Sequence, residues 1–285
     1  MTELGANRYG KSAIRLLKVV RRPDGHRVRD LTVAIALEGE FTASYVDGDN
    51  TNVVATDTMK NTVYAKAREH LTGSIESFGV VLASHFLEAA QVERVIVSID
   101  EHRWAPIGDA PDAFTRDRSS TRTAVVDARR DGTAIDAGVA DLTVLKTAKS
   151  AFSGFPRDDF TTLPETEDRL LATRLTASWR YDPNGLTLPV DFDALFVAVN
   201  ETMLDVFAEH QSVSVQASIW IIGKAIIERH AEVAEITMTM PNLHHWLADL
   251  SPFGQTNDRE IFIPTTEPHG LIQATVRRGD VAVSS

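Results

Sequence analysis

The chain has 285 residues, 43% of them hydrophobic and 24% charged, which is the composition of a globular protein with one large domain or two of ordinary size. Its formal net charge of -11 disfavours nucleic-acid partners, because a strongly acidic protein repels phosphate backbones. The chain contains no cysteine, so disulfides, thiolate metal sites and cysteine nucleophiles are excluded.

The first half of the chain predicts two strands, two helices and two further strands. Alternating apolar residues indicate the strands, and residues 22–25 carry the signal of a turn between the first two. Apolar residues recur every four positions from Met59 to Leu71, which is typical of one face of a helix. The expected elements are strands at 12–20 and 27–37, helices at 56–70 and from Gly73 to about Ala90, and strands at 92–99 and 121–128.

The second half repeats this order. Arg29 and Arg169 occupy similar places in the two halves, since each is expected to begin a long second strand. The repeated order predicts a duplication with units 1–137 and 138–285, each a ββααββ unit of an α+β fold with helices on one face of an antiparallel sheet. One large α+β domain is the alternative. The expected elements are strands at 138–147 and 168–181, helices at 191–210 (capped by Asp191) and 215–230, and strands at 234–240, 259–264 and 270–276.

Several familiar motifs are missing or incomplete. The sequence contains no GxGxxG, Walker loop, GxSxG or HExxH pattern. Residues 47–50 resemble the start of a calcium loop, but the twelfth position is Thr58 where a bidentate glutamate is needed, so a turn is expected. His244 and His245 are neighbours, and neighbouring side chains on a strand point to opposite faces, so we expect no metal there. The most apolar stretch, 218–227, is too short to span a membrane.

Six segments spread along the chain resemble the urate oxidase (uricase) family. They are RYGKSAIRLLKV (8–19), NVVATDTMKNTVYA (52–65), FSGFPRDDFTTLPETEDRLLAT (152–173), VQASIW (215–220), MPNLHHWLADL (240–250) and PHGLIQATV (268–276). The resemblance implies the tunnelling fold, with two ββααββ units per chain, sheets that pair between subunits into a barrel, and a homotetramer. It also implies oxidation of urate by O2 and water to 5-hydroxyisourate and hydrogen peroxide, without a metal or other cofactor.

The resemblance assigns the grip on urate to side chains that suit a flat purine anion. Arg169 and Gln216 hold the purine edges, because a guanidinium offers a fork of donors and a carboxamide offers both a donor and an acceptor. Phe152 stacks on the ring. Asp57 and Val215, each near the start of a predicted helix, contact the substrate through backbone groups, where unpaired amides favour an anion. The Asp57 side chain is also expected to cap its helix.

A proton route completes the implied site. Lys11, Thr56 and His244 match the family's relay, in which a desolvated lysine acts as base, the threonine hydroxyl passes a proton and the histidine exchanges it. Thr56 also contacts urate. Asn242, expected on the same strand face as His244, matches the residue that holds dioxygen or the attacking water. The resemblance places each site at a subunit interface, with Lys11 and Thr56 from one chain and the other side chains from its neighbour.

One departure from the family and two alternative functions follow from the same residues. Leu243 stands where relatives often have lysine, and its side chain is expected to point away from the site. The alternatives are another tunnelling-fold enzyme that acts on a pterin or GTP, and a non-catalytic purine-binding protein. A bacterial cytoplasmic location is expected, since the first residues lack the apolar core of a signal peptide and the last are not a peroxisomal SKL signal.

Overall fold

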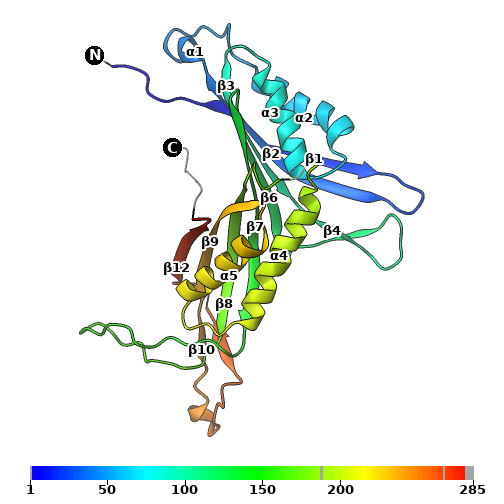
Figure 1. The fold of residues 1–285 in the computed structure, drawn as a ribbon. Helices are drawn as coiled ribbons and strands as arrows, with labels where there is room; N and C mark the ends of the chain where they lie inside the picture. The colour runs from blue at the N-terminus through cyan, green and yellow to red at the C-terminus, as the bar shows by residue number, and fades with distance from the viewer. Residues whose placement is uncertain (1, 187–188, 266, 280–285) are drawn as a thin grey trace. The chain divides into compact units, whose positions relative to one another are not determined.

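The chain packs as two compact units (Figure 1). The first comprises the residues up to Gly138 together with Trp179–Val197, and the second comprises Val139–Ser178 together with the residues from Ala198. The computed structural model describes residues 2–186, 189–265 and 267–279. Strands and helices of both units are joined in an α+β arrangement with antiparallel strand pairs, as the sequence predicts.

The first unit is built on an antiparallel sheet with two helices on one face. Its strands are neighbours in the order β1 (Tyr9–Val20), β2 (Arg27–Gly39), β3 (Val92–Glu101) and β6 (Thr121–Arg129), followed by the first part of β7 (Gly132–Lys146). Helices α2 (Thr56–His70) and α3 (Ile75–Leu87) pack against these strands. The covered face carries alternate apolar side chains such as Val33, Ile35 and Val97, all of them buried, because successive side chains on a strand point to opposite faces.

The two helices of this unit form where the sequence predicts them. Helix α2 has the predicted bounds, and its buried residues are Met59, Val63 and Ala67, which is the four-residue spacing of a single helix face. Helix α3 begins after Ser74, whose hydroxyl accepts a hydrogen bond from the Ser77 amide at 3.1 Å. It lies very close to β6: a Cβ added at Gly79 would lie 2.7 Å from a methyl group of Val126, so only glycine fits there.

The second unit has strands and helices in the same order as the first. It contains the later part of β7, most of β8 (Leu171–Tyr181), then β9 (Val233–Leu243) and β12 (Gly270–Arg277), and these are neighbours in that order. Helix α5 (Val215–Arg229) packs against β9 and β12. Helix α4 (Phe192–Glu209) runs from the first unit into the second. The predicted cap of α4 is confirmed, since the Asp191 carboxylate accepts a hydrogen bond from the Ala194 amide at 3.0 Å.

The structure corrects several predicted boundaries. Strand β8 begins at Leu171, so Arg169 lies before the strand and does not begin it. Strand β9 continues to Leu243, and the strand expected at 259–264 is reduced to its last three residues. The sequence analysis missed short elements because three to five residues are too few to show a period. These are α1 (Thr42–Val46), β4 (Trp104–Pro106) paired with β5 (Phe114–Arg116), β10 (His245–Leu247) and the 3-10 helix Ser251–Phe253. Strand β10 pairs with β11 (Phe262–Pro264), which is the observed part of the strand expected at 259–264.

Residues 47–50 follow α1 as irregular backbone, in which Gly48 has a φ of 71°. Within the described ranges, no three His, Asp or Glu side chains gather as a metal ion would require. The helices of these ranges are also all too short or too polar to cross a membrane.

Candidate functional site

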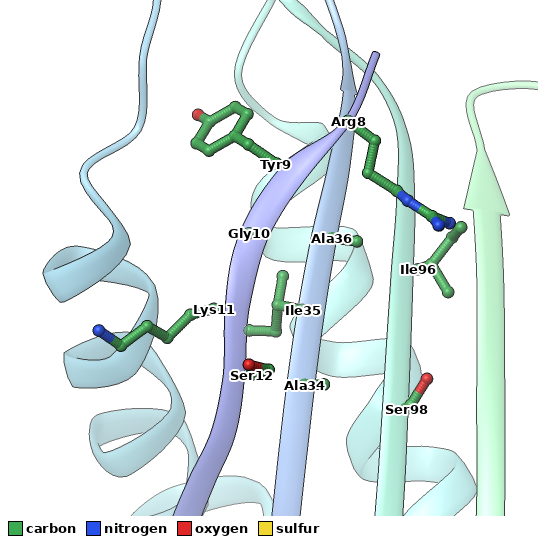
Figure 2. A pocket seen from close by; sticks show the side chains of 10 residues that line it. All are labelled: Arg8, Tyr9, Gly10, Lys11, Ser12, Ala34, Ile35, Ala36, Ile96 and Ser98. Atoms are coloured by element: carbon green, nitrogen blue, oxygen red, sulfur yellow. The ribbon is translucent and has the colours of Figure 1, made fainter. Parts of the chain in front are cut away.

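A bulge in β1 sets the direction of Lys11. Strands β1 and β2 pair regularly up to Lys11, opposite Ile35, and pairing resumes at Ile14, opposite Val33. Residues 12–13 therefore lie opposite a single residue of β2, and Ala13 has a φ of 55°. Bulges of this kind redirect the neighbouring side chains. In Figure 2 the half-buried Lys11 side chain extends away from β2 and β3, whereas Arg8 extends across them.

A hollow of about 400 Å³ lies beside this bulge. It is lined by residues 8–12 and by small or apolar side chains of β2 and β3, among them Ala34, Ala36 and Ser98 (Figure 2). Gly10 makes the close pairing of β1 and β2 possible here, because a Cβ at this position would lie only 1.9 Å from the carbonyl oxygen of Ile35. The segment that carries Lys11 is therefore held directly against β2.

Tyr9 joins this segment to the start of helix α2. Its hydroxyl accepts a hydrogen bond from the Val54 amide at 2.8 Å and donates one to the Val54 carbonyl oxygen at 3.2 Å. Its ring packs edge-on against Phe41, with 4.8 Å between the ring centroids. Val54 lies two residues before Thr56, the first residue of α2. Tyr9 therefore fixes the start of α2 relative to the strand that carries Lys11, and burial raises the pKa of its hydroxyl.

Thr56 and Asp57 lie in the first turn of α2. The residue that precedes the helix is Ala55, which provides no side-chain cap, so the expectation that Asp57 caps the helix is wrong. The Asp57 carboxylate instead pairs with Lys60 one turn later and accepts a hydrogen bond from Asn61 at 3.0 Å. The hydrogen bond from Lys60, the charge of Lys60 and the charge of Lys11 lower the pKa of Asp57. The first-turn backbone amides have no partner within the helix, which leaves them available to a ligand.

In the second unit, three segments distant in sequence form a backbone frame, which consists of residues 149–152, 166–169 and 212–214. The Ser212 amide donates to the Lys149 carbonyl oxygen at 2.9 Å, and the Ala151 amide donates to the Ser212 carbonyl oxygen at 2.7 Å. On the other side, Phe152 and Thr166 exchange two backbone hydrogen bonds, and the Arg169 amide donates to the Ser150 carbonyl oxygen at 2.7 Å. The frame thus brings Phe152 and Arg169 together, directly before the start of α5.

Arg169 is the electrostatic centre of this part of the site. Its guanidinium carbon lies 5.2 Å from the centroid of the Phe152 ring. Its Nε is buried and has no hydrogen-bond partner among the described residues, and burial lowers the pKa of the guanidinium. A buried donor without an acceptor is costly, so the arrangement favours an acceptor-rich ligand. The Phe152 ring also stacks on Phe155 at 5.0 Å, a contact that the FxxF spacing would have suggested and the sequence analysis missed.

Helix α5 begins next to the frame. The Ser214 hydroxyl caps the helix by accepting a hydrogen bond from the Ala217 amide at 3.1 Å. Val215 and Gln216 follow as the first two helical residues; the Val215 side chain is buried and that of Gln216 is exposed. The exposed carboxamide therefore lies at the amino end of the helix, where free amides and the helix dipole favour negative charge.

Asn242 and His244 lie at the end of β9. Asn242 is opposite Gly270 of β12, and the strand ends at Leu243. His244 falls between β9 and β10, so the expectation that His244 and His245 share one strand is wrong; the His244 carbonyl oxygen accepts hydrogen bonds from the amide (2.9 Å) and hydroxyl (3.1 Å) of Thr265. Burial lowers the pKa of His244, and the nearby charges of Arg169, His269 and His245 lower it further. The imidazole is therefore neutral near pH 7.

The predicted site residues thus form two groups. Lys11, Thr56 and Asp57 belong to the first unit. Contacts and charge interactions bring Phe152, Arg169 and His244 together in the second unit. The same unit holds Val215, Gln216 and Asn242 at the ends of its elements.

Comparison with known proteins gives a consistent result over almost the whole chain. The family model described as Uricase matches residues 7–127 and 135–273. A uricase of Arthrobacter globiformis is 46% identical over 276 residues, which cover 96% of this chain and 90% of the relative. A uricase of Dictyostelium discoideum is 38% identical, with 98% of each chain covered. The crystal structure of the Arthrobacter globiformis uricase has a TM-score of 0.95 at 44% identity and covers 100% of this chain and 98% of its own. The chain therefore belongs to the uricase family.

Proposed function

We infer that this protein is a urate oxidase that converts urate, O2 and water into 5-hydroxyisourate and hydrogen peroxide. Membership of the uricase family supports the reaction. The structural observation that supports the assignment is the half-buried Arg169, whose Nε has no hydrogen-bond partner among the described residues and whose guanidinium lies over the Phe152 ring. A flat, electron-rich purine anion supplies what this arrangement lacks, namely acceptor atoms, negative charge and a face for stacking.

Arg169 and Gln216 hold urate in this proposal. The guanidinium donates to two acceptors on one edge of the purine, and the carboxamide pairs with a donor and an acceptor on the opposite edge. Phe152 stacks on the purine with the face that Phe155 does not cover. Backbone groups of Asp57 and Val215 contact the remaining polar atoms, as their first-turn positions favour.

Lys11, Thr56 and His244 move the protons. Lys11 takes a proton from urate, the Thr56 hydroxyl passes it on, and the neutral His244 ring accepts it. The proximity of Lys11 to Asp57 supports a place for this lysine beside the start of α2. The urate dianion that results is rich enough in electrons to reduce O2 directly.

Asn242 holds O2 and later the attacking water. Two electrons pass from urate to O2, and the peroxide forms a bond to C5 of the purine. Water then replaces this group at C5, so hydrogen peroxide leaves and 5-hydroxyisourate remains. The carboxamide of Asn242 suits this position because it forms hydrogen bonds without adding a charge or a competing proton.

The two groups of site residues come from different subunits of a homotetramer in this proposal. Lys11 and Thr56 belong to one chain and the second-unit residues to its neighbour, with the sheets of neighbouring subunits joined into a barrel. A verified monomer should then bind urate weakly and show no turnover, which gel filtration combined with an activity assay would check. The cytoplasmic location and the duplication of units 1–137 and 138–285 remain predictions.

The experiment that tests the function follows the ultraviolet absorbance of urate after mixing with the purified protein in air. We expect the absorbance to decay while O2 is consumed and hydrogen peroxide appears in equal amounts. Arg169→Met should abolish this decay, because methionine keeps a similar bulk but offers no donors. Binding of urate without decay or peroxide would identify a purine-binding protein and would contradict the assignment.

A further inference from the structure

Three side chains, those of His210, Ser218 and Ser212, form a hydrogen-bonded chain that ends at the backbone frame. His210, which follows the last residue of α4, has its Nδ1 2.7 Å from the Val206 carbonyl oxygen and its Nε2 2.8 Å from the Ser218 hydroxyl. The Ser218 hydroxyl lies 2.8 Å from the hydroxyl of Ser212. Both serines are completely buried. None of these side chains has a part in the proton relay or the grip on urate described above.

The direction of the hydrogen bonds follows from the groups at the two ends. A carbonyl oxygen can only accept, so Nδ1 of His210 carries the ring proton and Nε2 of the neutral ring is an acceptor. The Ser218 hydroxyl then donates to Nε2 and accepts from Ser212; the two hydroxyls also lie 3.1 Å (Ser218) and 3.3 Å (Ser212) from the Ser214 carbonyl oxygen. The ammonium group of Lys146 donates to the His210 carbonyl oxygen, and its charge disfavours a positive charge on the ring. Burial of the imidazole also favours its neutral form.

The chain joins the two parts of the substrate grip. Ser212 belongs to the frame, and its backbone bonds the segment that carries Phe152. Ser218 is the fourth residue of α5, two residues after Gln216. His210 closes the chain from the end of α4. A displacement of Ser218 relative to Ser212 would therefore change the distance between Gln216 on one side and the frame on the other.

We propose that His210 is a positioning residue for urate, because it sets the separation between the start of α5 and the frame by accepting the hydrogen bond of Ser218. This inference rests on the proposed function. It predicts an effect on the binding of urate, since the side chains that it positions are those that hold the purine. It predicts little effect on turnover at saturating urate, because Lys11 and Thr56 lie in the other unit and the hydrogen bonds of this chain do not include His244.

The experiment compares four variants of the intact protein: His210→Leu, which removes the acceptor; His210→Gln, whose carbonyl oxygen can replace it; Ser218→Ala; and a matched control, His230→Leu. Nε2 of His230 also forms a hydrogen bond with a buried hydroxyl, that of Thr202 at 2.9 Å, but His230 lies just after the carboxyl end of α5. The dissociation constant of urate is measured without O2, where the bound substrate cannot react. The turnover number is then measured in air at saturating urate, and Tm is recorded for each variant.

We expect His210→Leu and Ser218→Ala to raise the dissociation constant roughly 10- to 100-fold, the loss that follows when a hydrogen bond to a charged group is broken. His210→Gln should restore most of the affinity, and His230→Leu should lower Tm without weakening binding. Turnover by the wild type together with equal affinities for His210→Leu and His230→Leu would overturn the inference and leave the proposed function intact. A wild type that does not oxidise urate would instead refute the function. Should Ser218→Ala fail to fold, the pair of His210 variants gives the same decision.

Discussion

Replacing Tyr9 by phenylalanine tests how the first unit prepares Lys11 and Thr56 for proton transfer. The change deletes the hydroxyl that bonds both the amide and the carbonyl of Val54, at 2.8 and 3.2 Å, and keeps the ring against Phe41. Each lost hydrogen bond costs about 0.5–1.5 kcal/mol, so stability should fall by about 1–3 kcal/mol. The start of α2 is then free to shift relative to β1, and misplacement of reacting groups by about 1 Å reduces rates up to roughly 100-fold.

The assay is steady-state urate oxidation together with anaerobic urate binding. Tyr9→Phe should lower the turnover number about 10- to 100-fold and change the dissociation constant much less. Tyr45→Phe is the matched control, since the Tyr45 hydroxyl donates one bond of 3.2 Å to the Arg8 carbonyl oxygen and its side chain is exposed. If Tyr9→Phe lowers Tm but keeps the wild-type turnover number, Tyr9 supports the fold alone and the reasoning is refuted.

Three further outcomes follow from single contacts. The buried Arg122 guanidinium lies 2.8 Å from the Glu76 carboxylate, and Glu76→Ala removes this partner. The free energy of unfolding should fall by about 3 kcal/mol more, and Tm by roughly 10 °C more, than in Glu76→Gln; equal Tm values would contradict this. Asp191→Ala removes the cap of α4 and should lower the free energy of unfolding, measured by urea denaturation, by about 1 kcal/mol; Asp191→Asn should lower it by only about a few tenths of a kcal/mol. Burial lowers the pKa of His244 below its ordinary 6.5, so the ring becomes charged only when the pH drops through that lowered value. A charged ring cannot accept a proton, so kcat/KM should fall in that pH range; a constant kcat/KM at low pH would argue against His244 as the acceptor.

The sequence predicts long periodic elements well and local geometry less well. Helix α2 has the predicted bounds because Met59, Val63 and Ala67 mark a single face over the full length of the helix. Apolar alternation extends almost to Arg169 and predicts a strand there, but the Arg169 amide instead donates to the Ser150 carbonyl oxygen and β8 begins only at Leu171. The local capping preference of aspartate predicts that Asp57 caps α2, but its carboxylate pairs with Lys60 instead.

Sequence patterns do not identify the residues that position the site. Tyr9 acts on Val54, 45 residues later, and nothing in the spacing of the two residues signals the contact. His210 and Ser218 are only 8 residues apart, but their hydrogen bond depends on how α4 and α5 are joined by the turn between them. Family resemblance predicts the residues proposed to contact urate, whereas the contacts that support them are visible only in the folded structure.

The most direct test of the account mixes two inactive variants. Lys11→Met removes the proposed base from the first unit, and His244→Ala removes the proton acceptor from the second. Each variant alone should fail to oxidise urate, while co-expressed chains should regain turnover, because a mixed tetramer contains some interfaces at which an intact Lys11 faces an intact His244. We predict urate decay and peroxide formation by the mixture alone. Wild-type turnover by either single variant, or a mixture that forms mixed tetramers and remains inactive, would contradict a site shared between two subunits.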